Sequence, residues 1–398
     1  MLSCRAMPAP PLAGTLVIAL EQAVAVPFAT RQLADLGARV IKIERPGGGD
    51  FARAYDTTVR GLSSHFVWLN RAKESLTLDL KRPAAQFVLA RLLERADVFV
   101  QNLAPGAADR LDLGNERLRR KYPRLITCSL TGYGSSGPYA SKKTYDLLVQ
   151  SEVGLLSITG TEETPSKAGL SIADVAGGMY AYSGILAALI QRGRTGEGTA
   201  LEVSLFDALG EWMGYPMYYT MGGSPPSRTG ASHATIAPYG PYETKDERVI
   251  FGIHTSREWS AFCSIVLERP ELGEDPRFQT NKLRVEHRRV MDSAILDVFR
   301  RLTAAEVIQR LDRAGIANAR INSVSQFIHH PQLAARNLWR QVDSPVGRVA
   351  ALIPPVRMDG VDPVMGAIPE LGQHTESILT ELGFDAETIA RWKDEHVF

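Results

Sequence analysis

The sequence is poor in cysteine and carries almost no net charge. Its 398 residues include three cysteines, Cys4, Cys128 and Cys263, which are widely separated and form no CxxC pair. This pattern disfavours a disulfide scaffold and a zinc site. The 45 Lys and Arg residues nearly balance 44 Asp and Glu residues, leaving a formal charge of +1. No surplus of positive charge is available for wrapping a nucleic acid or a membrane surface, so any anion must be bound locally.

Long apolar runs are also missing. The most apolar early stretch, Thr15–Thr30, is interrupted by Glu21, Gln22 and Pro27, whereas a membrane span needs about 20 apolar residues. Residues 1–11 lack the apolar core of a signal peptide. We therefore expect a cytoplasmic protein that does not cross a membrane.

Several familiar cofactor motifs are absent from the chain. It contains no P-loop, no GxSxG elbow, no HExxH and no GxGxxG after the first predicted strand. We therefore expect neither a bound metal ion nor a nucleoside triphosphate.

The N-terminal part alternates between strand and helix patterns. Short apolar runs predict buried strands, and stretches of helical period lie between them. The predicted strands are 15–20, 39–43, 98–101 and 125–130, and the predicted helices are 28–36 and 84–95. Strand, helix and strand within about 30 residues form a βαβ unit, whose right-handed crossover makes the sheet parallel. The sequence thus predicts a doubly wound, Rossmann-like α/β domain.

The length predicts two or three domains. A long helix over 174–191, a strand over 199–204 and a helix over 205–213 precede the strongest linker signal, Gly222–Gly230. The next hundred residues show a strand at 249–253 followed by helices, which is typical of a smaller α+β domain. We expect a domain boundary at this linker.

Asp174 is the first candidate for chemistry. It opens the long helix and is followed by Ala176, Gly177 and Gly178, so little side-chain bulk surrounds its carboxylate. The helix N-terminus should favour the ionised form, and an accessible carboxylate can act as a nucleophile. A structural helix-capping aspartate is the alternative.

Other polar positions are weaker candidates taken one at a time. The Gly47–Asp50 run could bring backbone amides close to a phosphate, or form a tight turn. Lys73, Arg53 and Arg110 could bind phosphate or carboxylate, or be solvated surface residues. His233 follows the linker, where it could contact a ligand between domains.

Taken together, these positions resemble the family III CoA-transferases over nearly the whole chain. The ordered series of matching blocks is specific, although each block alone is weak. The blocks are Ala25–Pro27, Leu33–Ala38, Val40–Pro46, Gly49–Asp50, Leu69–Lys73, Ser75–Lys81, Asn102, Pro105–Gly106, Arg110–Leu111, Gly132–Gly134, Gly137–Pro138, Tyr145–Leu147, Asp174, Arg194–Gly198 and Leu371–Thr375.

The resemblance implies an interlocked homodimer of ring-like chains, each with a large domain built from both termini. The corresponding limits are 1–198 for the first part of the large domain, 199–228 for a linker, 229–322 for the small domain and 323–398 for the return segment. Asp174 matches the family's catalytic aspartate. Lys73, Asn102, Arg110 and Leu111 match its CoA contacts, with Arg45 near the adenine end, and Tyr145, Tyr133 and His233 are expected at the substrate.

The substrates implied are an acyl-CoA and a small carboxylic acid. Formyl-CoA transferases carry a glutamine where this chain has Val24 and a glycine-rich loop where it has Gly230–Tyr239, so a formate–oxalate enzyme is disfavoured. The pattern is more like members that use succinyl-CoA with glutarate, itaconate, mesaconate or citramalate.

Three alternatives remain. An α-methylacyl-CoA racemase would need the histidine of a Gly-His-Asp motif, where this chain has Thr144–Asp146. CoA could also move between two carboxylates of one molecule. A module that binds CoA without catalysis would leave Asp174 without a purpose.

Overall fold

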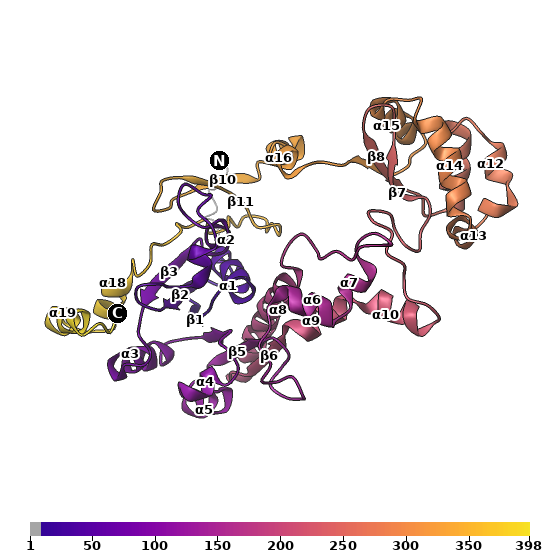
Figure 1. Ribbon diagram of the computed structural model, residues 1–398. Helices are drawn as coiled ribbons and strands as arrows, with labels where there is room; N and C mark the ends of the chain where they lie inside the picture. Colours follow the sequence, from indigo (N-terminus) through magenta and orange to yellow (C-terminus); the bar gives the residue numbers. More distant parts are fainter. Residues whose placement is uncertain (1–8) are drawn as a thin grey trace. The chain divides into compact units, whose positions relative to one another are not determined.

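The computed structural model describes residues 9–398, so Cys4 and most of the segment 1–11, predicted to lack a signal peptide, lie outside the described residues. The chain divides into two compact units, labelled by element in Figure 1. The first unit contains Met1–Val153, Gly169–Trp212 and Arg336–Phe398, and the second contains Gly154–Ala168 and Met213–Ala335.

The first unit is built on a six-stranded parallel sheet. Its strands are β1 (Leu16–Leu20), β2 (Arg39–Glu44), β3 (Lys73–Thr77), β4 (Val98–Gln101), β5 (Ile126–Thr131) and β6 (Ala200–Ser204). They lie in the order β3-β2-β1-β4-β5-β6, which confirms the predicted parallel, doubly wound sheet. The order of strands reverses between β1 and β4, and ligands of such sheets bind at the carboxyl ends of the strands around that point.

Helices cover both faces of this sheet. On one face lie α1 (Ala25–Asp35) and the long α8 (Ile172–Thr195). On the other, apolar side chains of four helices pack with Ile18, Ile41 and Phe99 into one core. These helices are α3 (Pro83–Leu93), α5 (Asn115–Lys121), α18 (Thr375–Glu381) and α19 (Ala386–Asp394). The remaining elements of the unit are η1 (Phe51–Ala54), α2 (Ser64–Leu69), α4 (Ala107–Arg110), α6 (Asp146–Glu152), α9 (Leu205–Trp212), β10 (Trp339–Val342) and β11 (Val349–Leu352).

Strand β3 is a strand that the sequence did not predict. Its residues Lys-Glu-Ser-Leu-Thr are mostly polar, so no apolar run marks it. Its outer edge is covered by the C-terminal segment, where the amide of His374 donates to the carbonyl of Ser75 at 3.0 Å and the amide of Gly372 donates to the Ser75 hydroxyl at 2.9 Å. The last 63 residues, Arg336–Phe398, therefore belong to the first unit because they satisfy an open sheet edge.

Helix α8 is unusually long and apolar. Within residues 9–398 it is the one helix that could cross a membrane by length and composition, but a core helix of a soluble protein passes the same test. An uninterrupted apolar run does not mark it, since Asp174 and four glycines lie within its sequence. In the structure Ala173, Ala176, Ile185 and Ala188 are buried along it.

The second unit has a three-stranded antiparallel sheet with helices around it. Its strands, in spatial order, are β7 (Tyr239–Glu243), β8 (Arg248–Gly252) and β9 (Asn318–Arg320). Its helices are α7 (Leu155–Ile158), α10 (Gly214–Met221), α11 (Ser256–Ala261), η2 (Phe262–Val266), α12 (Glu271–Glu274), η3 (Pro276–Phe278), α13 (Asn281–Glu286), α14 (Arg288–Phe299), α15 (Ala304–Arg313), α16 (Val324–Ile328) and α17 (Pro331–Ala335).

The compact units differ from the predicted domain limits. The segment 199–228, predicted as a linker, contains β6 and α9 of the first unit and α10 of the second. The second unit also includes Gly154–Ala168 and extends to Ala335, past the predicted start of the return segment at residue 323. Local composition marks the irregular stretch 222–230, whereas the division into units depends on contacts between distant segments.

Candidate active site

Asp174 lies in the first turn of α8, and its side chain is partly exposed. Of the two glycines that follow it, Gly178 serves the packing of α8 on α1, whereas Gly177 faces Leu205 and Leu130. A Cβ on Gly178 would lie 2.5 Å from the carbonyl oxygen of Ala25 and 3.1 Å from a ring carbon of Phe28. The sequence suggested that these glycines leave open space beside the carboxylate, but Gly178 instead permits close contact with α1. This contact holds the start of α8 at the start of α1.

The amide groups at the start of α8 are taken by Asp146, the first residue of α6. Its Oδ1 accepts hydrogen bonds from the backbone amides of Ala173 at 2.7 Å and Asp174 at 3.3 Å, and its Oδ2 accepts one from the Gln150 side chain at 2.6 Å. These amides belong to the first turn of the helix, where no helix carbonyl can pair with them. Asp146 thus acts as the cap of α8 from another helix. Ser171, at the N-cap position itself, makes no side-chain cap bond.

Burial, and to a smaller extent the charge of Asp146, raise the pKa of Asp174 to about 7. The expectation that the helix N-terminus keeps Asp174 ionised is therefore wrong. The amides that would have stabilised its charge are bonded to Asp146, and partial burial removes much of its hydration. At neutral pH the carboxyl group of Asp174 lies close to its titration midpoint.

Two tyrosines share the electrostatic environment of Asp174. Tyr55 follows η1 and is 48% exposed, and Tyr145 precedes α6 and is 69% exposed. Burial raises the pKa of Tyr55 to about 12, with further contributions from Asp50, Asp174 and Tyr145. Tyr55 therefore keeps its proton and remains a hydrogen-bond donor. Neither Tyr55 nor Asp146 was predicted as a site residue. Asp146 does lie in the matching block Tyr145–Leu147, whereas nothing in the local sequence distinguishes Tyr55.

Asn102 lies at the reversal of strand order, directly after β4. Its Oδ1 accepts a hydrogen bond from the backbone amide of Gln22 and its Nδ2 donates one to the carbonyl of the same residue, both at 2.9 Å. Gln22 follows β1, so this two-bond clamp ties together the loops at the carboxyl ends of the two central strands. The predicted binding residue thus shapes the loop after β1.

Two predicted CoA-binding arginines have free guanidinium groups. Arg45 after β2 and Arg110 at the end of α4 are exposed, and neither forms an ion pair or a side-chain hydrogen bond with the residues described. The Arg110 guanidinium lies over Gly106, where a Cβ would be 3.1 Å from its Nη1. Both groups can therefore receive an anion without breaking an existing bond.

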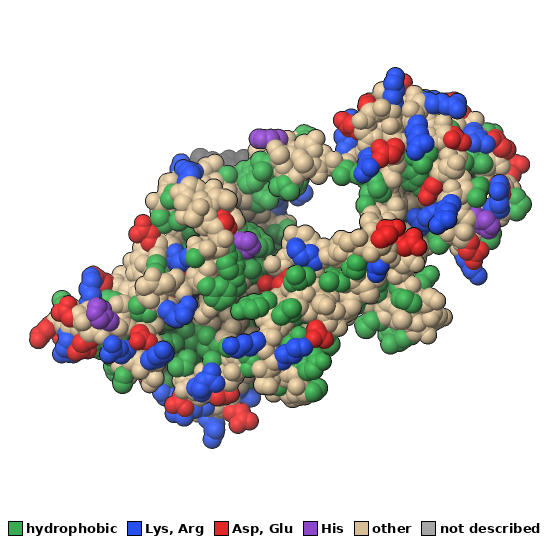
Figure 2. Space-filling view, in the orientation of Figure 1, with side chains coloured by type: hydrophobic (Ala, Val, Ile, Leu, Met, Phe, Trp, Pro, Cys, Tyr) green, Lys and Arg blue, Asp and Glu red, His purple; other side chains and the backbone are tan. Residues whose placement is uncertain are grey.

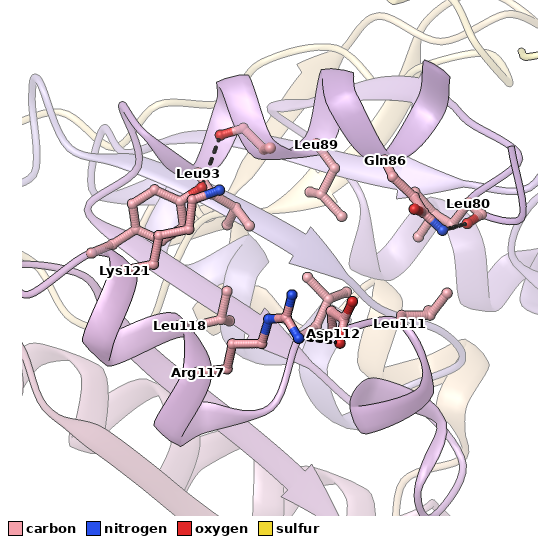
Figure 3. Close-up of a pocket in the computed structure, with 12 residues that line it drawn as sticks. Leu80, Gln86, Leu89, Leu93, Leu111, Asp112, Arg117, Leu118 and Lys121 are labelled. Atoms are coloured by element: carbon pink, nitrogen blue, oxygen red, sulfur yellow. Dashed lines mark hydrogen bonds and ion pairs between the residues drawn. The ribbon is translucent and has the colours of Figure 1, made fainter. Parts of the chain in front are cut away.

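Leu111 lines a cavity of about 220 Å³ beside α3 and α5, shown in Figure 3. Leucines make up half of the lining residues, and Arg117 and Lys121 add positive charge. Arg117 is paired with Asp112 at 2.6 Å. The other lining residues are Leu80, Gln86, Leu89, Ala90, Leu93, Leu113, Leu118 and Tyr122.

Lys73 is placed differently from the prediction. Its side chain is fully buried, and its Nζ donates to Glu21 Oε1 at 2.6 Å and to Pro27 O and Asn70 Oδ1, each at 3.1 Å. Burial lowers the pKa of Lys73 to about 8, so it remains charged at neutral pH. With its three donors satisfied, Lys73 cannot reach a CoA phosphate without breaking a buried ion pair. In this structure it is a core residue.

The same buried network holds the glycine-rich turn after β2. Lys42 Nζ bonds Asp50 Oδ2 at 2.7 Å, and Asp50 Oδ1 accepts the amides of Ala23 and Ala52, each at 2.9 Å. Burial by itself would raise the pKa of Glu44, but the Arg53 guanidinium bonds it at 2.8 Å through both oxygens and, with Lys42, lowers it to about 2. Arg53 is therefore unavailable as a phosphate ligand, and the run 47–50 is a tight turn.

The remaining predicted residues fall on both units. In the first, the Tyr133 ring packs edge-on to Tyr139 at 5.2 Å, and its buried hydroxyl has no hydrogen-bond partner. In the second, His233 stacks on Tyr239 at 5.5 Å, and its Nδ1 accepts the amide of Thr235. Burial, Arg288 and His254 lower the pKa of His233, so the ring is neutral at pH 7. Among residues 9–398 no group of three or more His, Cys, Asp or Glu side chains could hold a metal ion.

Comparisons with known proteins identify the family of this chain. Residues 12–375 match the model of CoA-transferase family III. The chain is 33% identical over 385 residues to a Homo sapiens succinyl-CoA:glutarate CoA-transferase, covering 95% of this chain and 88% of that protein. It is 34% identical over 400 residues to the succinate–glutarate CoA-transferase of Agrobacterium fabrum, covering 96% and 97%. A crystal structure of a CaiB/BaiF family protein from Brucella suis matches with a TM-score of 0.81 and 32% identity, covering 94% and 100%.

Proposed function

The chain belongs to CoA-transferase family III, and we propose that it transfers CoA from succinyl-CoA to a small dicarboxylic acid through a covalent intermediate on Asp174. The observation that carries the proposal is the Asp174 carboxyl group itself, which is partly exposed at the start of α8 and has a pKa of about 7. The names of the two relatives above support succinyl-CoA and a dicarboxylate as the substrate class.

In the first half of the reaction, an Asp174 carboxylate oxygen attacks the thioester carbonyl carbon of succinyl-CoA. The carbon–sulfur bond breaks, CoA leaves as the thiolate, and a mixed anhydride links succinate to Asp174. The thiolate then attacks the carbonyl carbon of Asp174 in this anhydride. Succinate leaves as the carboxylate, and Asp174 carries CoA as a thioester.

The second half repeats these steps in reverse with the acceptor. An acceptor carboxylate oxygen attacks the Asp174 carbonyl carbon and expels CoA thiolate, which then attacks the acceptor carbonyl carbon of the new anhydride. Asp174 is released as a carboxylate, and the acceptor leaves as its CoA thioester. One thioester replaces another, so the protein has to position the reactants and stabilise oxyanions. The protonated Tyr55 hydroxyl is a candidate donor for that purpose.

The CoA moiety would lie along the carboxyl ends of β1 and β4. Arg45 and Arg110 supply unpaired cations for its phosphates, Asn102 shapes the loop after β1, and the leucine-lined cavity at Leu111 offers an apolar surface for the adenine. Lys73 has no part in this arrangement. Tyr145 and Tyr133 remain candidates for the acyl and acceptor groups, as does His233 on the second unit.

We also propose that the active form is a cytoplasmic, interlocked homodimer. Large apolar side chains are exposed on the first unit, including Met179 (37%), Ile190 (61%), Phe206 (38%) and Trp212 (44%). Figure 2 shows apolar side chains gathered on the face of this unit that it draws. Surfaces of this kind are typical of protein interfaces. Sedimentation of the purified protein should show a particle of two chains.

Chemical trapping tests the proposed intermediate. The protein is incubated with succinyl-CoA, treated with hydroxylamine or with borohydride, and the peptide that contains Asp174 is analysed by mass spectrometry. We expect a hydroxamate or a reduced alcohol at Asp174, and no modification in Asp174→Asn. The matched control is Asp207→Asn, which removes an exposed carboxylate from the first turn of α9 and should trap as well as the wild type.

A panel of dicarboxylic acids assayed with succinyl-CoA would identify the acceptor. An unmodified Asp174 peptide, together with α-proton exchange on a 2-methylacyl-CoA, would favour the racemase instead.

A further inference from the structure

We propose that Asp146 is a positioning residue that caps α8 in place of Asp174 and thereby keeps the Asp174 carboxylate destabilised until it is acylated. The inference rests on the proposed function, because it takes Asp174 as the nucleophile. It concerns a residue that does not itself touch the reacting atoms.

The carboxylates of Asp146 and Asp174 differ in how many hydrogen bonds stabilise their charge. Asp146 reaches α8 from α6, and one of its oxygens binds the amides of Ala173 and Asp174. Its other oxygen is held by the Gln150 side chain one turn further along α6. Asp146 therefore has three hydrogen bonds that stabilise its charge. Asp174 lies at the same end of the helix, but the backbone amides that would stabilise its charge already donate their hydrogen bonds to Asp146.

The consequence for catalysis follows from charge. Asp174 is negative only while it is a free carboxylate, and both the mixed anhydride and the CoA thioester are neutral at this position. Repulsion from Asp146 and loss of hydration therefore raise the free energy of the starting state and disappear once the covalent bond forms. A carboxylate with a raised pKa is also the stronger nucleophile. Asp146 thus favours attack at the expense of the fraction of Asp174 that is ionised at neutral pH.

Asp146 is the charged group with the largest effect on Asp174. It faces Asp174 from α6, and its charge adds to the effect of burial on the pKa of Asp174. Tyr55, at the end of η1, interacts electrostatically with Asp174 and Tyr145, and it stays protonated because its pKa is raised to about 12. The charge of Asp50 also raises the pKa of Tyr55, and Asp50 is itself paired with Lys42 at 2.7 Å. Removing the charge at position 146 should therefore change the ionisation of Asp174 directly.

Asp146→Asn tests this inference, since asparagine keeps an acceptor oxygen for the two amides and loses the negative charge. The titration of Asp174 is followed by the ¹³C shift of its carboxyl carbon in protein carrying ¹³C-labelled aspartate, assigned by its absence in Asp174→Asn. We expect a midpoint near pH 7 in the wild type and roughly one pH unit lower in Asp146→Asn. The acidic limb of kcat/KM should move with it, and the rate on the alkaline plateau should fall several-fold. Asp207→Asn should change neither.

The outcomes separate this inference from the proposed function. A wild-type Asp174 that titrates near pH 4, or a midpoint that does not move in a folded Asp146→Asn protein, overturns the role of Asp146 even if CoA is transferred normally. Failure to trap an adduct at Asp174 overturns the proposed function, whatever the titration shows. If Asp146→Asn does not fold, the wild-type midpoint still decides, because a value near 4 contradicts the proposed electrostatics.

Discussion

Replacing Asp174 with asparagine should make the folded protein more stable at alkaline pH while abolishing the proposed activity. In the native structure burial and Asp146 raise the pKa of Asp174 to about 7 from an ordinary value of 3.8. Between these two values the folded protein holds a proton that the unfolded chain has released. The free energy of unfolding therefore falls as the pH rises from about 4 to about 7, and the full penalty is present above pH 7.

The magnitude follows from the difference between the two pKa values. Each pKa unit corresponds to 1.36 kcal/mol, so the whole difference corresponds to a ceiling of about 4 kcal/mol. The Asp174 side chain is partly exposed, and solvent screening reduces the effect. We therefore expect Asp174→Asn to gain about 1–3 kcal/mol over the wild type at pH 8.5, and little or nothing at pH 4.

Urea unfolding of both proteins at pH 4, 5.5, 7 and 8.5 measures this difference. Its dependence on pH is the informative quantity, because the intrinsic cost of exchanging Asp for Asn at this helix position is the same at every pH. Asp207→Asn is the control and should differ from the wild type by a constant within about 0.5 kcal/mol. A difference for Asp174→Asn that stays flat with pH, or one in which the wild type gains stability as pH rises, would refute the reasoning.

Four further substitutions, one of them a control, test the arrangement around the site. Gly178→Ala should lower stability and transfer activity, because the new Cβ would lie 2.5 Å from the carbonyl oxygen of Ala25. The control Gly193→Ala, on the same helix, meets no atom within 4 Å and should stabilise the protein by about 0.5–1 kcal/mol. Thermal melting compares the two variants, and equal effects would contradict the α1–α8 contact. Lys73→Met should lower the free energy of unfolding in urea by about 3–5 kcal/mol, because it leaves the buried Glu21 without its closest cation. Normal stability together with weakened succinyl-CoA binding would instead indicate that Lys73 binds CoA. Arg110→Ala should raise the KM for succinyl-CoA about tenfold with kcat little changed, and an unchanged KM would remove Arg110 from the phosphate site.

Local patterns in the sequence were sufficient for most of the parallel sheet. Buried central strands such as β1 and β4 are short apolar runs, and the βαβ spacing limits how they can be connected. The same patterns located Asp174 at the start of a long helix. These features depend on residues within one element or between neighbouring elements, so they leave a regular signal in the chain.

Features that depend on contacts between distant segments were decided only by the tertiary structure. Strand β3 carries polar residues, because its lysine and serine are satisfied by Glu21 and Glu44 and its outer edge is covered by the segment around His374. Lysine is usually a surface residue, yet the hydrogen-bond partners of Lys73 allow it to be buried in the core. Asp146 takes the amides of a helix that begins 26 residues further along the chain, and this interaction reverses the expected effect of the helix end on Asp174. The sequence by itself thus determined most of the parallel sheet and the identity of the candidate nucleophile. Which charges are paired, and therefore which carboxylate carries the raised pKa, depends on distances in space that no local pattern records.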